Sequence, residues 1–463
     1  MDGIKYRSAD EMKDSGIQWL GRLVPLDWKV YRAKYIWKKE NRPVQPDDMV
    51  VTAFRDGQVT LRENRRTEGF TFAIKEIGYQ RVLKGDLVIS AMDAFAGAMG
   101  ISESTGKCSP VYSVCSPFKP VEQAYYGYLL KDMAQKNYIL SLAKGIRERS
   151  TDFRYAEFGD TILTYPTILE QRKIANFLNI KCAQFDSIIA KKEQLIAKLE
   201  EAKKSLISEV VTGKVKIVDG QLVPRQPEEM KNSGVEWLGM IPKEWNAKKI
   251  KYIKSSKRNS FVDGPFGSNL KSEHYVDDGD VYIVESGFIS TGEFLNKDFK
   301  TITNSHFNTI KRSSCTEGDI VIAKIGANFG MSGILPKLDK PSVVSGNSLK
   351  LSVAEQYSNK YIQYSLLALR FQGAIHFIVN GSAQPALTLG SLNELKMCAP
   401  PIIEQFEIVE ISDRKLGIIN NQINRNLYQI SLLKSAKQSL ITEAVTGKID
   451  LRDWEIIEQG GAS

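Results

Sequence analysis

Apolar residues recur every seven positions in two long stretches of the chain, which is the pattern of a coiled-coil helix. Each stretch carries two such rows of apolar side chains. The rows of the first stretch are Phe185, Leu199 and Leu206, and Ile188, Leu195 and Ala202; those of the second are Ile419, Leu433 and Leu440, and Ile423 and Ile430. Lys192 and Asn426 interrupt the rows with polar side chains. The pattern predicts two helices, each with a packing seam of about three to four heptads.

The sequence also marks where both helices begin and end. Pro166 and Pro400 precede them, and Glu170 and Glu404 fall in the first turn, where a carboxylate suits the helix dipole. At the other end, each helix meets a Thr-Gly-Lys triplet whose glycine can adopt the left-handed conformation of a helix cap. Two such helices can pair as an antiparallel coiled coil, in which residues 185–211 would span about 40 Å. The alternative is that each helix packs only against its own globular domain.

The two helices belong to a larger internal duplication. The decapeptide MKDSGIQWLG at 12–21 recurs as MKNSGVEWLG at 230–239, an offset of 218 residues. PTILEQ at 166–171 recurs as PPIIEQ at 400–405, an offset of 234, and the same offset relates the helix ends LEEAKKSLISEVVTGK and LKSAKQSLITEAVTGK. The segments between these blocks differ in length and hardly resemble each other. We call the repeated blocks the frame and the segments between them the inserts. We predict that the two copies of the frame perform the same function and that the two inserts perform different ones. The alternative is an old gene duplication whose two copies have no shared function.

Both inserts are predicted to be mixed α/β domains. Short apolar runs bounded by turn residues predict strands at 87–91, 111–115, 280–284, 320–325 and 348–352, and longer stretches predict helices at 122–138 and 356–378. The predicted order is a first frame segment (1–21), the first insert (22–164), the first helix (165–217), a linker with the second frame segment (218–239), the second insert (240–398), the second helix (399–451) and a tail (452–463). The fold class is thus α/β, with a pseudo-two-fold internal repeat.

Basic residues cluster in turn-like parts of both inserts. The clusters are Arg62, Arg65 and Arg66 in the first insert, and Lys254, Lys257 and Arg258 in the second. Such clusters suit the phosphates of a nucleic acid, because each neutralised phosphate releases a counterion. For any one of these residues, a solvated surface charge is the alternative.

A polar loop precedes the Pro-containing block in each copy. The first is KGIRERS at 144–150, with Arg147 and Arg149; the second is NGSAQP at 380–385, with Asn380, Ser382 and Gln384. Arg, Asn and Gln present paired hydrogen-bonding groups to base edges. The loops are therefore candidate base readers, and ordinary polar surface loops are the alternative.

Composition narrows the class of protein. The chain has 463 residues, and its net charge of +9 permits a polyanionic partner without requiring one. The first fifteen residues contain no apolar core, and no run reaches the roughly eighteen apolar residues of a membrane span. The five cysteines are scattered, with no Cys-x-x-Cys pair. We expect a cytoplasmic protein without a disulfide framework, a metal site or a membrane partner.

No pattern of catalytic residues emerges from the sequence. GISESTGK at 100–107 has five residues between its glycines, where a phosphate-binding loop has four, and Cys108 follows it. His274, His306 and His376 are far apart in sequence and are expected to be isolated from one another. The chain is therefore predicted to bind rather than to catalyse.

These motifs together resemble the specificity subunits of Type I restriction–modification systems. The resemblance rests on SGIQWLG followed by Pro25 and Trp28, on the Pro-x-Ile-x-Glu-Gln helix entry and on the EVVTGK helix end, each with a similar second copy. Thr167, where the second copy has Pro401, is a small departure. Each motif alone would be weak, whereas two copies separated by one variable domain are specific.

The resemblance implies a function for each part. The inserts would be two target-recognition domains that each read half of a split, asymmetric sequence in double-stranded DNA. The paired helices would hold them apart and dock two methyltransferase subunits, joined by ATP-dependent restriction subunits. S-adenosylmethionine and ATP would bind to those partners, and this chain would hold no cofactor. Two alternatives are a self-contained DNA methyltransferase or nuclease with degenerate motifs, and a duplicated coiled-coil scaffold for proteins only.

Overall fold

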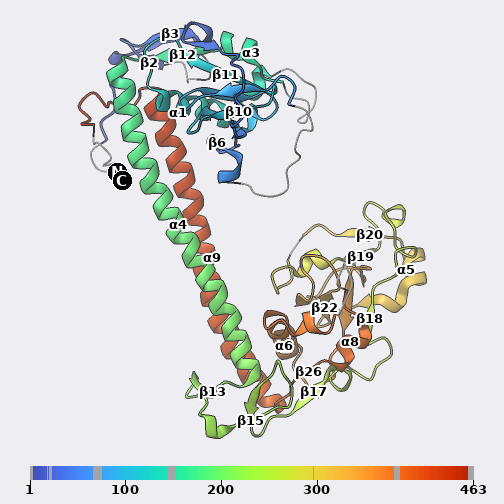
Figure 1. Ribbon diagram of the computed structural model, residues 1–463. Coiled ribbons are helices and arrows are strands. Elements are labelled where there is room, and N and C mark those ends of the chain that lie inside the picture. The colour runs from blue at the N-terminus through green and yellow to red at the C-terminus, as the bar shows by residue number, and fades with distance from the viewer. Residues whose placement is uncertain are drawn as a thin grey trace. The chain divides into compact units, whose positions relative to one another are not determined.

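The computed structural model describes residues 4–17, 19, 23–65, 76–143, 152–295, 297–379 and 386–456. The chain forms two compact units. Unit 1 consists of Met1–Lys192 and Leu427–Ser463, and unit 2 consists of Glu193–Asn426. The boundary between them falls inside both long helices, so each unit contains one end of each helix (Figure 1).

The two long helices, α4 (Ile168–Thr212) and α9 (Ile402–Val445), begin and end where the sequence predicts. Gly213 and Gly447 follow their last turns with φ of +69° and +74°, which is the left-handed conformation expected of the cap. The predicted acidic residues lie in the first turns. At the entry of α4, the Thr167 hydroxyl accepts a hydrogen bond from the Glu170 amide at 3.3 Å. The local signals for these helix ends are confirmed.

Within each unit, α4 and α9 run antiparallel to each other (Figure 1). In unit 1, Lys192 Nζ donates to Gln429 Oε1 at 2.6 Å, and six residues earlier on α4 Asp186 accepts from Lys437 Nζ at 2.6 Å. In unit 2, Lys203 Nζ donates to Asn420 Oδ1 at 3.0 Å. The polar residues predicted to interrupt the seam thus lie where the helices meet. The buried Asn426 donates to the Gln422 carbonyl of its own helix at 2.9 Å.

Part of the predicted packing row on α4 is wrong. Ile188 and Leu195 are 44% and 45% exposed and Ala202 is also exposed, whereas Ile189 is only 8% exposed. A heptad seam alternates steps of three and four residues, and apolar residues stand at both positions after Phe185, so periodicity alone does not separate the two rows. The remaining predicted positions are buried at Ile423, Ile430 and Leu440 and half-buried at Phe185, Leu199, Leu206, Ile419 and Leu433.

Unit 1 contains an α/β domain built on a four-stranded antiparallel sheet of order β4-β11-β8-β9. Its core includes Trp28, Trp37, Tyr125 and Tyr126, all fully buried. The strands and shorter helices of unit 1 are β1 (Met12–Asp14), β2 (Leu23–Pro25), β3 (Lys29–Arg32), β4 (Trp37–Lys39), β5 (Val51–Ala53), β6 (Val59–Leu61), β7 (Gln80–Val82), β8 (Leu87–Ser90), β9 (Met99–Ile101), β10 (Gly106–Cys108), β11 (Tyr112–Pro117), α1 (Gln123–Gln135), α2 (Tyr138–Leu142), α3 (Tyr155–Asp160) and β12 (Ile162–Tyr165).

Unit 2 contains a second α/β domain whose main sheet has the order β18-β25-β22-β23, again antiparallel throughout. A second sheet, β20-β19-β24-β21, includes the parallel pair β19 and β24. The strands and shorter helices of unit 2 are β13 (Val215–Val218), β14 (Gln221–Pro224), β15 (Met230–Asn232), β16 (Met240–Pro242), β17 (Ala247–Lys249), β18 (Phe261–Asp263), β19 (Val281–Val284), β20 (Lys300–Ile302), α5 (Asn304–Ile310), β21 (Ser314–Cys315), β22 (Ile320–Ala323), β23 (Ser332–Ile334), β24 (Ser342–Val344), β25 (Ser348–Leu351), α6 (Asn359–Phe371), α7 (Ala374–Phe377), α8 (Leu389–Glu394) and β26 (Lys396–Cys398).

The two inserts, so different in sequence, therefore share the strand order of their main sheets and the elements that follow those sheets. In both, the main sheet is followed by a helix of 13 residues, α1 or α6, and a later strand, β12 or β26, pairs with an early one, β3 or β17. The predicted strands are confirmed to within one or two residues at each end. The predicted helix at 122–138 corresponds to α1, which ends shortly before Asn137 with its positive φ. The predicted helix at 356–378 is divided into α6 and α7, because Gly373 adopts positive φ.

Candidate nucleic-acid interface

The blocks that occur twice in the sequence hold each α/β domain to the ends of the long helices. Gln171 and Gln405 are fully buried, and each donates to the proline carbonyl that precedes its helix, at 2.9 and 2.8 Å. Their side-chain carbonyls accept from the backbone amides of Glu122 and Ser358, at 2.9 Å in both units. The glutamine of the Pro-x-Ile-x-Glu-Gln block therefore joins the start of a long helix to the start of α1 or α6.

The end of each long helix is held by the insert of the other copy. In unit 1, the buried Tyr125 hydroxyl donates to the Val445 carbonyl of α9 at 3.1 Å. In unit 2, the Tyr361 hydroxyl donates to the Val211 carbonyl of α4 at 3.2 Å. A domain thus binds the beginning of the helix that follows it and the end of the helix from the other repeat. This exchange requires the frame to be present twice.

The chain ends also follow the duplication. Val215 pairs with Pro224 in the hairpin of β13 and β14 in unit 2. In unit 1, an isolated bridge joins Tyr6 to Ile449, which are the residues at the corresponding places of the repeat. Segments from the two ends of the chain therefore make the contact that a continuous hairpin makes in unit 2.

The basic cluster of the first insert is partly neutralised. Arg62 Nε donates to Thr52 Oγ1 at 3.3 Å, and Arg65 Nη1 donates to both carboxylate oxygens of Asp56, at 2.9 and 2.7 Å. The Arg65 guanidinium also lies 4.4 Å from the centre of the Phe54 ring. Arg66 lies outside the described residues. Because Arg65 already has a carboxylate partner, a phosphate would have to compete with Asp56 for it.

The basic cluster of the second insert differs in that respect. Lys257 and Arg258 are exposed in the turn before β18, and Lys254 is half-buried. In the described part of the chain, none of these three side chains has a carboxylate within ion-pairing distance. The charges of these three cations, which are close in sequence, therefore remain available to a phosphate.

Both candidate base-reading loops lie outside the described residues, including Arg147, Arg149, Asn380, Ser382 and Gln384. The residues that follow each loop nevertheless make the same backbone contact in the two domains. The Phe153 amide donates to the Ala91 carbonyl at 2.9 Å, and the Leu387 amide donates to the Lys324 carbonyl at 3.0 Å. Ala91 and Lys324 are the first residues after β8 and β22, which occupy the same position in the two main sheets. We call this side of each domain the loop edge.

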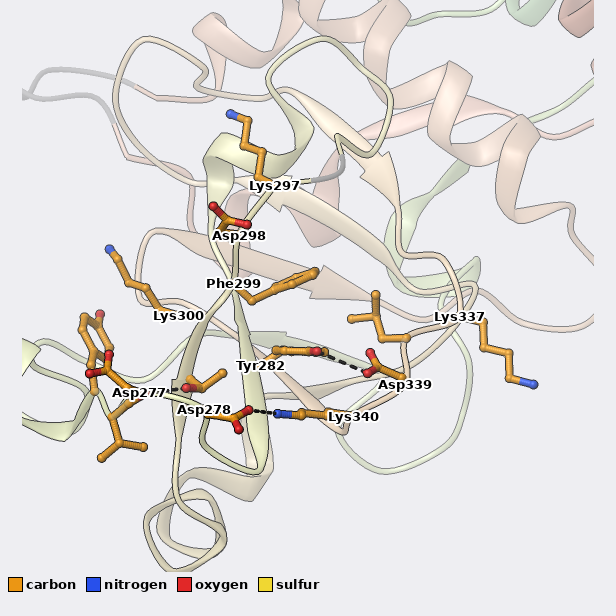
Figure 2. A pocket seen from close by; sticks show the side chains of 14 residues that line it. Asp277, Asp278, Tyr282, Lys297, Asp298, Phe299, Lys300, Lys337, Asp339 and Lys340 are labelled. Carbon is orange, nitrogen blue, oxygen red and sulfur yellow. Dashed lines mark hydrogen bonds and ion pairs between the residues drawn. The ribbon is translucent and has the colours of Figure 1, made fainter.

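A hollow of about 830 Å³ lies on the second sheet of unit 2 (Figure 2). The Tyr282 and Phe299 rings stack there with centroids 4.3 Å apart, and the Tyr282 hydroxyl donates to Asp339 at 3.3 Å. The charges around it balance, because four lysines and four aspartates line it: Lys297, Lys300, Lys337, Lys340, Asp277, Asp278, Asp298 and Asp339. A hollow with this balance of charge has little electrostatic attraction for a phosphate backbone.

The described residues contain no group of three or more His, Cys, Asp or Glu side chains that could hold a metal ion. One sequence expectation is corrected, because His274 and His306 are not isolated: their rings stack at 4.0 Å. His274 Nδ1 accepts from the Lys271 amide and His306 Nε2 donates to the Asn269 carbonyl, both at 2.9 Å. The pair thus fixes the backbone of the segment around residues 269–274.

The cysteines are unsuited to nucleophilic chemistry. All five are buried and free of disulfides. Burial raises the pKa of four thiols to about 12, so they are protonated at neutral pH; these are Cys108, Cys115, Cys315 and Cys398. Cys182 also has a raised pKa, again chiefly because of burial. Among the described helices, none has the length and apolar character needed to cross a membrane.

Comparison with known proteins identifies relatives along nearly the whole chain. Residues 287–429 match the family described as the Type I restriction modification DNA specificity domain. The chain is 23% identical to the Type I restriction enzyme MjaVIII specificity subunit of Methanocaldococcus jannaschii, over 94% of this chain and 95% of that protein. It is 20% identical to the EcoKI specificity subunit of Escherichia coli strain K12, over 80% and 76% of the two chains.

The fold is also found among solved structures. A chain from a study of the assembly and conformational transition of a type I R-M system matches with a TM-score of 0.60. The match covers 92% of this chain and 99% of that one, at 13% sequence identity. At this level of identity, the likeness concerns the arrangement of elements, which is the mixed α/β architecture of two domains described above.

Proposed function

We propose that the chain is a type I restriction–modification specificity subunit, and that it recognises a DNA target in two halves, one with each α/β domain. The observation that carries this proposal is that two inserts with little sequence similarity have the same sheet order and the same loop edge. A shared scaffold with different loops suits two readers of different sequences. Because the loops differ, the two half-sites are expected to differ as well.

Binding would divide between phosphate and base contacts, as in other DNA-binding proteins. Lys254, Lys257 and Arg258 are proposed to contact phosphates around the second half-site, since they lack carboxylate partners among the described residues. Arg62 and Arg65 are weaker candidates, because Arg65 is paired with Asp56. The loops at 144–150 and 380–385 are proposed to read bases, because the chain enters the loop edge directly after both of them.

The two long helices are proposed to form an antiparallel coiled coil that sets the distance between the half-sites. The contacts of Lys192 with Gln429 and of Lys203 with Asn420 support this pairing from within the two units. In the proposed pseudo-two-fold arrangement, the duplicated frame offers two equivalent surfaces and would dock two methyltransferase subunits. S-adenosylmethionine would bind to those subunits, and ATP would bind to the restriction subunits that join them.

Mapping of methylated adenines tests the two-reader proposal directly. The chain is purified with its methyltransferase partner, and DNA exposed to the complex is sequenced for N6-methyladenine. We expect one bipartite motif. Replacing residues 22–164 by the corresponding insert of another specificity subunit should change one half of that motif and leave the other half unchanged. A change in both halves would contradict independent reading, and methylation by the purified chain alone would indicate a self-contained enzyme.

A matched deletion tests the role of the helices. Removing one heptad from each, residues 189–195 and 427–433, shortens each rod by about 10 Å. That length corresponds to about three base pairs of DNA at about 3.4 Å per base pair. We expect the spacer in the methylated motif to shorten by about this amount or specific binding to be lost. An active complex with an unchanged spacer would refute the proposed ruler.

A further inference from the structure

Two glycine-containing loops meet at the loop edge of unit 2. One loop, residues 264–270, follows β18, and the other, residues 345–347, precedes β25. A Cβ atom on Gly264 would lie 1.9 Å from the Ser345 carbonyl oxygen, and one on Gly346 would lie 2.7 Å from the Pro265 carbonyl oxygen. Since only glycine permits such close approach of two backbones, the loops are held in a defined position relative to each other.

Further hydrogen bonds hold the first loop in shape. The Asn269 amide donates to the Phe266 carbonyl at 2.7 Å and closes a turn. The Asn269 carbonyl in turn accepts from His306 Nε2 at 2.9 Å, so α5 supports the far end of the loop. The side chains at the tip of this turn are therefore presented from a rigid support, which lowers the entropy cost of binding through them.

The loops border a hollow of about 430 Å³ and present two kinds of side chain to it. Phe266 is 65% exposed, although it is a large apolar residue on a polar part of the surface. Asn347 also lines the hollow and is exposed, and its side-chain amide has no hydrogen-bond partner in the described part of the chain. Glu285 lines the hollow as well, and its carboxylate accepts from Lys300 Nζ at 2.8 Å. One wall of the hollow can thus make apolar contact, and another can donate and accept hydrogen bonds.

A lysine lies beside the aromatic ring. Lys324 Nζ is 5.7 Å from the centre of the Phe266 ring and 3.7 Å from Asp263 Oδ2. The Lys324 carbonyl also accepts a hydrogen bond from the Leu387 amide at 3.0 Å. The hollow and Leu387 therefore lie at the same edge of the domain.

We propose that this hollow is a base-reading site for the second half of the DNA target. Phe266 packs against the apolar edge of a base, such as the methyl group of thymine, and the Asn347 amide forms paired hydrogen bonds with a neighbouring base edge. This inference rests on the proposed function and adds residues that contact the target outside the polar loop.

The loop edge of unit 1 supports this inference. There, the exposed Met92 follows Ala91 directly after β8, and the exposed Arg55 lies 2.8 Å from Asp93. An exposed apolar side chain thus follows the equivalent strand in unit 1, next to an aspartate that is paired with a cation.

The test uses the complex of the full chain with its methyltransferase partner. Affinity is measured for a duplex that carries the motif mapped by adenine methylation and for a duplex of shuffled sequence. We expect Phe266→Ala and Asn347→Ala each to weaken binding to the target roughly 5- to 100-fold, with little effect on the shuffled duplex. Methylation mapping should show relaxed sequence preference at one or two positions of the second half-site, and unchanged preference in the first.

Tyr252→Ala is the matched control. Tyr252 is also 65% exposed and has Lys251 Nζ 5.3 Å from its ring centre, but it lies in the 3-10 helix Ile250–Tyr252, away from the loop edge. It should leave affinity and methylation pattern unchanged. The inference is overturned if Phe266→Ala and Asn347→Ala keep the wild-type pattern, or if Tyr252→Ala has the same effect. A wild-type complex that produces no bipartite motif would instead overturn the proposed function.

Discussion

Replacing Gly213 by alanine tests how closely the end of α4 is packed in unit 2. A Cβ atom at this position would lie 2.3 and 2.5 Å from two ring carbons of Pro242 and 3.0 Å from the Trp245 ring. The proline ring is rigid, and Trp245 is almost fully buried, so neither neighbour can simply rotate away. The substitution must therefore displace the backbone.

Two costs add up at this site. Gly213 has φ of +69°, and a non-glycine residue in the left-handed region costs about 1–2 kcal/mol. Forcing an extra methyl group into a packed site costs about 1–3 kcal/mol more. The expected loss of unfolding free energy is therefore about 2–5 kcal/mol. Gly220→Ala separates the two costs, because Gly220 has φ of +71° and an added Cβ there would meet no atom within 4 Å, so it should lose only about 1–2 kcal/mol.

Urea unfolding of the full chain, followed by tryptophan fluorescence, measures both losses. Gly447→Ala provides an independent repeat in unit 1, where the added Cβ would lie 2.5 Å from Pro25 Cγ. We expect both helix-end variants to lose more stability than Gly220→Ala by about 1–3 kcal/mol. Equal losses for Gly213→Ala and Gly220→Ala would show that only backbone strain matters and that the helix end does not pack tightly against the frame.

Three further outcomes follow from the contacts described above. Gln405→Ala should lower the unfolding free energy by about 2–4 kcal/mol, because it leaves a buried amide and a buried carbonyl unpaired. Gln422→Ala, at an exposed site, should change the unfolding free energy by less than about 0.5 kcal/mol. At pH 8 the native cysteines should not react with Ellman's reagent, and rapid labelling of the native chain would contradict this. The unfolding free energy should also fall as pH rises from 9 toward 12. Thiols ionise in the unfolded chain over this range, whereas four thiols of the folded chain stay protonated because their pKa is raised to about 12. Replacing Lys257 and Arg258 together by alanine should reduce the slope of log binding constant against log salt concentration by about two. Lys340 is paired with an aspartate, so an equal reduction by Lys340→Ala would refute the assignment of Lys257 and Arg258 to phosphates.

Features that depend on a few neighbouring residues could be predicted well. The Thr-Gly-Lys triplets end both helices at a glycine with positive φ, because the cap conformation is a local property of the backbone. The short apolar runs of the inserts became strands for a similar reason. The glutamine of the Pro-x-Ile-x-Glu-Gln block was visible in the sequence as a repeated residue, but its role could not be predicted. Its hydrogen bond to Ser358 or Glu122 joins residues 47 or 49 positions apart.

Features that depend on distant residues could not be predicted. Heptad spacing predicted Ile188 as a seam residue, whereas the fold buries Ile189 and leaves Ile188 exposed. Arg65 looked available to a phosphate in the sequence, whereas the fold pairs it with Asp56. His274 and His306 looked isolated, although α5 brings their rings together.

The amino-acid order alone thus establishes the duplication, both helix boundaries and the α/β character of the inserts, because propensity, capping and periodicity act over a few residues. Folding establishes that the two inserts have the same sheet order, and that each insert holds the end of the other repeat's helix. It also places Phe266 and Asn347 at one hollow. These features arise from close packing between segments far apart in the chain, where shape and burial determine which side chains meet.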